Sequence, residues 1–221
     1  KGVFSFCMCP GGHIVPSATA PGEVVVNGMS ASTRSSRYAN SGMVVAIEPG
    51  DLQAYTQYGA LAGLVFQQEM EKMAWAAGGK TQAAPAQRMV DFSSGKFSNT
   101  LNDCSYIPGV NSAPLHELLP SMIGDRLQKG FKAFGRKMKG YYTNEANILG
   151  VESRTSSPIR IPRDAELLSH PQITNLYPCG EGAGYAGGIV SAAIDGERCA
   201  EAIKNSIYAD SSSESFLSTS S

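Results

Sequence analysis

Five glycines within nine residues, late in the chain, are the most evident candidate for chemistry: Gly180, Gly182, Gly184, Gly187 and Gly188. Residues 182–187 fit the pattern G-x-G-x-x-G, between a predicted strand over 173–179 and a predicted helix from about 188 to 206. Such a turn lets backbone approach a phosphate at the positive end of a helix. A classical NAD-binding unit also needs a following strand and an acid roughly 20 residues on. The predicted helix leads into a serine-rich tail instead, so the sequence argues against that unit.

A second arrangement of the same residues suits a flavin. Some flavoproteins end in a strand with Gly-Glu, then glycines, then a helix whose positive end faces the flavin pyrimidine. There Glu181 would contact the ribityl or pyrophosphate region, and the backbone at Gly187, Gly188 and Ile189 would lie close to the ring. The helix N-terminus would stabilise negative charge on the reduced flavin. The alternative is a packing turn that holds a phosphate or no ligand.

Two cysteines near the start, Cys7 and Cys9, form a second candidate in the segment Cys-Met-Cys-Pro-Gly-Gly. We expect these two thiols, on an extended strand, to point to opposite faces, which disfavours a mutual disulfide. One interpretation is a redox partner or acid near the flavin; the other is packed cysteines beside a turn. No second Cys/His pair completes a zinc set, and the three histidines are far apart, so we expect no metal site.

Three arginines lie within eleven residues of the segment 154–164, and we take Arg154 and Arg160 as candidate catalytic or substrate-binding residues. Guanidinium groups bind carboxylates and phosphates in a bidentate fork, which would suit an anionic substrate or part of a cofactor. Ordinary surface salt bridges explain them equally well.

The composition limits the partners. Eighteen Lys and Arg balance 19 Asp and Glu, giving a net charge of −1, so bulk charge favours neither nucleic acid nor an acidic membrane. The apolar runs are far shorter than the roughly 20 residues of a spanning helix. Five cysteines without regular spacing argue against a secreted disulfide framework. The sequence predicts a soluble protein with a small-molecule substrate, no nucleic-acid partner and no membrane partner.

The elements that must position these residues are of mixed type. Short strands are predicted over 2–8, 12–15, 23–27, 43–47, 148–153, 159–161 and 173–179. Helices are predicted over 60–77, 113–138, with a kink at Pro120, and 188–206. Residues 81–110 are predicted to be an irregular crossing, and the tail is predicted to be disordered.

Three motifs together resemble a family of FAD-dependent, or NAD(P)/FAD-dependent, oxidoreductases of the glutathione-reductase-like superfamily: SFCMCPGG from residue 5, GVESRTSSPIRIPRD from residue 150 and LYPCGEGAGYAGGIVSAAIDG from residue 176. The resemblance implies an α/β fold, with an α+β substrate-side domain inserted into a Rossmann-like FAD domain. We expect residues 1–165 to form the former, 166–207 the last strand and helix of the latter, and 208–221 a disordered tail. The βαβ unit that binds the ADP half of FAD is expected to be missing, because we expect the chain to start inside a fold.

The resemblance implies a flavin-dependent dehydrogenase fragment that transfers hydride between FAD and an unknown substrate or NAD(P)H. The alternative is a non-catalytic binding module. The expected FAD contacts are Gly180, Glu181, Gly182, Gly187, Gly188 and Ile189. The motif variants resemble plant plastid members, which implies the chloroplast stroma; the cytoplasm is the alternative location.

Overall fold

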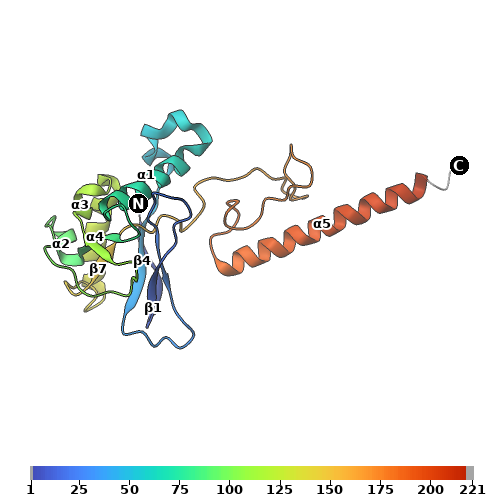
Figure 1. The fold of residues 1–221 in the computed structure, drawn as a ribbon. Coiled ribbons are helices and arrows are strands. Elements are labelled where there is room, and N and C mark those ends of the chain that lie inside the picture. Colours follow the sequence, from blue (N-terminus) through green and yellow to red (C-terminus); the bar gives the residue numbers. More distant parts are fainter. Residues whose placement is uncertain (1, 218–221) are drawn as a thin grey trace. The chain divides into compact units, whose positions relative to one another are not determined.

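The computed structural model describes residues 2–217, which form two compact units. Unit 1 is Lys1–Ser153 and unit 2 is Arg154–Ser221, so the division lies earlier than the predicted boundary after residue 165. Helices and strands are mixed along the chain, which confirms the α/β class (Figure 1). No helix of the described part is long and apolar enough to cross a bilayer.

Unit 1 begins with two antiparallel strand pairs. β1 (Val3–Pro10) pairs with β4 (Ala39–Val45) (Figure 1). β2 (His13–Pro16) pairs with β3 (Val26–Met29). The first, second and fourth predicted strands overlap these elements, and the third is shifted toward Met29. Alternating β-branched and small residues between Gly-rich breakers carry enough local signal for short strands.

A three-stranded sheet lies at the centre of unit 1, in the order β6-β5-β7. β5 (Ala84–Arg88) is parallel to β6 (Val110–Ser112) and antiparallel to β7 (Asn147–Leu149). The prediction of an irregular crossing over 81–110 is therefore wrong, because it contains β5 and the short helix α2 (Met89–Ser93). Ala-Pro-Ala-Gln-Arg has no β-branched residue and hence no local strand signal. Its first four residues are all buried, so packing makes it a strand.

The helices of unit 1 follow the predicted periodicity. The 3-10 segments η1 (Pro49–Asp51) and η2 (Gln53–Leu61) precede α1 (Ala62–Ala77), which matches the predicted helix 60–77. The predicted helix 113–138 is two helices, α3 (Leu115–Leu118) and α4 (Ser121–Lys137). Leu119 is extended and Pro120 caps α4, because the residue before a proline is driven out of the helical region.

Two apolar clusters form the core of unit 1. One gathers Val24, Val26, Ala74, Ala84 and Tyr106, between β3, α1 and β5. The other gathers Met89, Phe92, Leu115, Leu127 and Phe131, where α2, α3 and α4 meet. These clusters hold the short sheet between helices.

Unit 2 contains one helix, α5 (Ile189–Leu217), among its described residues (Figure 1). The strands predicted over 159–161 and 173–179 are wrong: no strand is found there in the described chain, and β7 ends at Leu149 rather than at residue 153. A strand needs a neighbour for its backbone groups. Here local bonds serve instead, such as His170 N–H to the Leu176 carbonyl at 2.8 Å.

The tail differs from its prediction as well. Residues 208–217, expected to be disordered, continue α5 to Leu217, and residues 218–221 lie outside the described part. Adding a residue to an existing helix is easier than nucleating a new one, so a helix extends into a segment of weak local preference.

Truncation of Phe92 tests the second cluster. Phe92 is fully buried, and its ring meets the ring of Phe131 edge to face at a centroid distance of 6.0 Å. We expect Phe92→Ala to lower the free energy of unfolding by about 3–5 kcal/mol through lost burial and a cavity. Phe97→Ala, at a half-exposed position, should change it by no more than about 0.5 kcal/mol. Urea unfolding of both variants checks this, and equal losses would contradict the packing described.

Candidate functional site

The glycine turn, residues 180–188, comes just before α5 in unit 2, and two of its glycines are required by the fold. Gly180 and Gly184 have φ of 71° and 83°, a backbone region that other residues rarely adopt. A Cβ at Gly184 would lie 2.7 Å from the Ile159 carbonyl oxygen. Backbone bonds of 2.9 Å from Gly184 to Glu181 and from Tyr185 to Gly180 close the turn.

The other glycines of the turn are not explained in this way. A Cβ at Gly182 or Gly187 would meet no heavy atom within 4 Å, and neither has a left-handed φ. At Gly188 the nearest atom would be the Ser191 hydroxyl oxygen at 3.8 Å. Ile189, the first residue of α5, is 91% exposed. The turn therefore presents open backbone next to an exposed apolar side chain.

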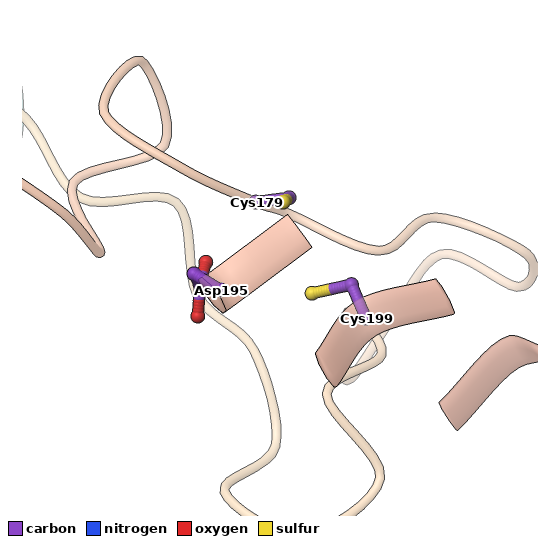
Figure 2. Close-up of side chains that lie close together, drawn as sticks. All are labelled: Cys179, Asp195 and Cys199. Carbon is purple, nitrogen blue, oxygen red and sulfur yellow. The ribbon is translucent and has the colours of Figure 1, made fainter. Parts of the chain in front are cut away.

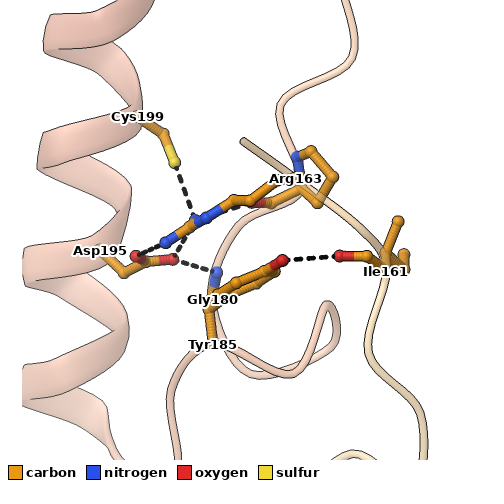
Figure 3. Close-up of polar contacts among 7 residues, drawn as sticks. Ile161, Arg163, Gly180, Tyr185, Asp195 and Cys199 are labelled. Carbon is orange, nitrogen blue, oxygen red and sulfur yellow. Dashed lines mark hydrogen bonds and ion pairs between the residues drawn. The ribbon is translucent and has the colours of Figure 1, made fainter. Parts of the chain in front are cut away.

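A buried ion pair holds the turn against α5. Arg163 Nη2 and Nη1 donate to the two Asp195 carboxylate oxygens at 2.7 and 3.0 Å, and both side chains are 7% exposed (Figure 3). The Gly180 N–H also donates to Asp195 at 2.9 Å, and Arg163 donates to the Pro178 carbonyl at 2.8 Å. The Arg163 hydrogen bonds, above all, lower the pKa of Asp195 to about 2. The carboxylate is thus charged and accepts three hydrogen bonds.

Tyr185 connects the segment that contains Ile161 to the Arg163–Asp195 ion pair. Its ring lies 3.6 Å under the Arg163 guanidinium, and its hydroxyl donates to the Ile161 carbonyl at 2.8 Å (Figure 3). The predicted site residue Arg160 stacks on the same ring at 4.3 Å. Arg160, Arg163 and Arg198 line an open hollow of about 470 Å³. Three guanidinium groups and one carboxylate, Asp164, thus line the hollow, and the guanidinium groups can accept an anion.

Two thiols lie beside Asp195. Cys179 is exposed on the loop before the turn, whereas Cys199 is buried on α5, one helical turn after Asp195 (Figure 2). The two sulfur atoms and a carboxylate oxygen all lie within 4.8 Å of one another. Burial, followed by the interaction with Cys199, raises the pKa of Cys179. The set resembles a metal site in residue type, but the carboxylate is engaged by Arg163 and Gly180, so it is not arranged for a cation.

Unit 1 holds the other predicted catalytic residues. The pairing of β1 shifts between Phe6 and Cys9, where Cys7 has a φ of 47°. Residues two apart on a regular strand share a face, so the expected opposite faces do not follow from strand geometry, and the irregular pairing at Cys7 interrupts the regular register as well. Both thiols are free, Cys7 exposed and Cys9 partly buried. The pKa of Cys7 is raised by burial first and next by the charge of Glu152, whose own pKa is raised by burial.

The structure thus groups the predicted residues by unit. The glycine turn and Arg160 belong to unit 2, as does Arg154 at its start, whereas Cys7 and Cys9 belong to unit 1. Sequence reasoning did not single out Glu152, Arg163, Cys179, Asp195 or Cys199. The spacing of Asp195 and Cys199, four residues apart on a predicted helix, was the available signal for one shared face.

Removing Arg163 tests the ion pair. We expect Arg163→Gln to lower the stability of unit 2 by roughly 3 kcal/mol, because the Asp195 carboxylate would stay buried without its cation. Asp195 has a lowered folded pKa, so its contribution is complete above its ordinary pKa of 3.8 and is lost as pH falls through about 2. The free energy of unfolding of the variant should not show this decrease at low pH. Urea unfolding followed by far-ultraviolet circular dichroism between pH 5 and 2 measures both effects.

Arg160→Gln is the matched control, because Arg160 stacks on the same tyrosine and lies in the same segment. We expect it to cost no more than about 1 kcal/mol. Equal destabilisation by the two variants would contradict the special role of Arg163.

Glu152→Gln tests the contact between Glu152 and Cys7. Loss of the carboxylate charge should lower the pKa of Cys7, since that charge disfavours the thiolate. The pH dependence of iodoacetamide alkylation, with Cys7 resolved by peptide mass spectrometry, should shift to lower pH. Glu145→Gln, at an exposed position, should leave the profile in place; an unshifted profile in Glu152→Gln would show that the two groups do not interact.

Comparison with known proteins assigns the family. The sequence model described as "FAD-dependent protein, C-terminal domain-like" matches residues 1–155, which corresponds to unit 1. An uncharacterized protein of Clostridium beijerinckii is 42% identical over 205 residues, which cover 92% of this chain and 38% of that relative. The chain therefore spans well under half the length of this relative. By the match over most of its length, the chain belongs to the family of FAD-dependent proteins that share this C-terminal domain.

Proposed function

We propose that these 221 residues serve as the substrate-side and C-terminal part of a flavin-dependent oxidoreductase. The reaction would be hydride transfer between FAD and a small-molecule substrate, with NAD(P)H as a candidate reductant. The observation that carries the proposal is the FAD-dependent family match over residues 1–155. The relative's greater length supports a role within a longer polypeptide.

The glycine turn of unit 2 fits FAD in three respects. Open backbone at Gly182 and Gly187 allows the close approach that a large planar ligand requires. The turn leads into the N-terminus of α5, which favours negative charge. Ile189 and Val190, 91% and 71% exposed, offer apolar surface for a ring system. When bound, FAD supplies the hydride-accepting chemistry.

The chain's own residues would position the glycine turn and set the protonation of groups in the other unit. Arg163 and Asp195 hold Gly180 in place, and hence the start of the turn. The exposed Glu181 side chain is available for ribityl or phosphate-side hydroxyls, and its backbone carbonyl closes the turn. In unit 1, burial raises the pKa of Glu152, and burial, followed by the charge of the Glu152 carboxylate, raises the pKa of Cys7, so each of the two groups affects how readily the other gives up a proton.

The substrate proposal follows from the arginine hollow. Arg160 lies on its rim, exposed and stacked on Tyr185, while the Arg163 charge is balanced by Asp195. A carboxylate or phosphate group on the substrate would meet Arg160 and Arg198 in the bidentate manner typical of guanidinium groups. We therefore propose a small anionic substrate.

A purely structural turn is the alternative function class. In its favour, the positive φ of Gly180 and Gly184 is explained by the turn alone. It gives no reason for glycine at 182 and 187, where a side chain would meet open space. These two positions therefore discriminate between the proposals.

Gly187→Val in the full-length protein tests the flavin proposal. The variant should fold, since a Cβ at this position would meet no heavy atom within 4 Å, but it should bind FAD at least about tenfold more weakly, because the side chain would occupy the ligand's space. Binding is measured by the absorbance of oxidised flavin near 450 nm, about the usual band, and by titration with FAD.

Gly50→Val, at an equally open glycine of unit 1, is the matched control and should bind FAD normally. Normal affinity in Gly187→Val would overturn the assigned contact. Failure of the unmodified full-length protein to bind added FAD would overturn the flavin function itself.

A further inference from the structure

The loop before the glycine turn and helix α5 each bring one thiol to the same place. Cys179 Sγ and Cys199 Sγ lie within 4.8 Å of each other, and one is exposed while the other is 4% exposed (Figure 2). We propose that Cys179 and Cys199 form a reversible disulfide that fastens the glycine turn to α5.

The surroundings leave room for the two sulfurs to approach. A Cβ at Gly196, on the same helix, would lie 3.9 Å from Cys179 Sγ, so Cys179 packs against α5 where the helix has no side chain. A bond needs the sulfurs about 2.05 Å apart, so the proposal requires the exposed Cys179 side chain, which lies on a loop before α5, to move its sulfur toward Cys199. The remaining cysteines, Cys7, Cys9 and Cys104, belong to unit 1.

The charged neighbours favour a dithiol over a metal site. Arg163 Nη1 lies 3.4 Å from Cys199 Sγ and donates to the Asp195 carboxylate as well (Figure 3). This contact places the positive guanidinium beside the sulfur. The guanidinium repels a metal cation at the same point, and it occupies the carboxylate that would complete the ligand set.

The different exposure of the two thiols determines which of them reacts first in a thiol–disulfide exchange. The Cys179 thiolate attacks a small disulfide such as oxidised glutathione, forms a mixed disulfide and releases one glutathione thiolate. The Cys199 thiol loses its proton to solvent and its sulfur attacks Cys179 Sγ, which releases the second glutathione. Two protein thiols are oxidised and one disulfide is reduced to two thiols. Because burial raises the pKa of Cys179, the thiol–disulfide exchange is expected to be slower than for an ordinary thiol, and the position of the equilibrium is the quantity to measure.

The bond would close a loop over residues 179–199. This loop contains the whole glycine turn, the start of α5 and Asp195. A covalent closure removes conformations from such a segment. Oxidation would therefore restrict the turn whether or not a flavin binds it, so this inference stands apart from the proposed function.

Peptide mapping after redox equilibration tests the bond. The protein is equilibrated in buffers of defined reduced-to-oxidised glutathione ratio, treated with iodoacetamide and digested with trypsin. Cleavage after Arg163, Arg198 and Lys204 places Cys179 in peptide 164–198 and Cys199 in peptide 199–204. The expected result is these two peptides joined, with the joined fraction rising as the buffer becomes oxidising and falling again on reduction. Hydrogen exchange of residues 180–188 should slow in the oxidised form.

Cysteine variants and a zinc assay provide the controls and the results that would contradict the disulfide. Cys179→Ser and Cys199→Ser should each abolish the joined peptides, and Cys104→Ser, at a partly buried thiol of unit 1, should leave them unchanged. Glutathione on Cys179 without joining, or equal alkylation of both thiols in every buffer, would overturn the proposal. Stoichiometric zinc retained by the unmodified protein and protecting both thiols would overturn it in favour of a metal site.

Discussion

The Arg163–Asp195 pair is the interaction on which the described structure of unit 2 depends. It joins groups 32 residues apart, and its members also bind the Pro178 carbonyl, the Gly180 N–H and the Tyr185 ring. Unit 2 has no sheet and little buried apolar surface in its described part, so polar contacts must do what a core does elsewhere. A buried pair is stable only when its remaining donors and acceptors are satisfied, and this pair meets that condition.

Unit 1 is stabilised by apolar packing rather than by polar contacts. Its central strand β5 is built from small, buried residues, and the apolar clusters of α1, α2 and α4 enclose it. Such a strand is specified by its neighbours, which explains why Ala-Pro-Ala-Gln-Arg carried no visible signal whereas α1 and α4 did. The family match ends at residue 155, close to where this packed unit gives way to unit 2.

The same distinction explains what could be predicted of the site. The glycine turn and the start of α5 were predictable because glycine spacing and helical periodicity are local signals. Arg163 and Asp195 were not, because a pairing across 32 residues leaves no trace in one sequence. The strands predicted at 159–161 and 173–179 failed for a related reason: apolar character marks a strand only where a neighbouring strand accepts its hydrogen bonds.

The glycines of the turn separate into two kinds, and this separation links fold to function. Gly180 and Gly184 are explained by backbone conformation, so their presence says nothing about a ligand. Gly182 and Gly187 face open space, so a requirement for glycine there must come from a group outside the described chain. All four lie between Cys179 and Cys199. A bound cofactor and a disulfide would thus act on the same segment, and by thermodynamic linkage each would change the free energy of forming the other.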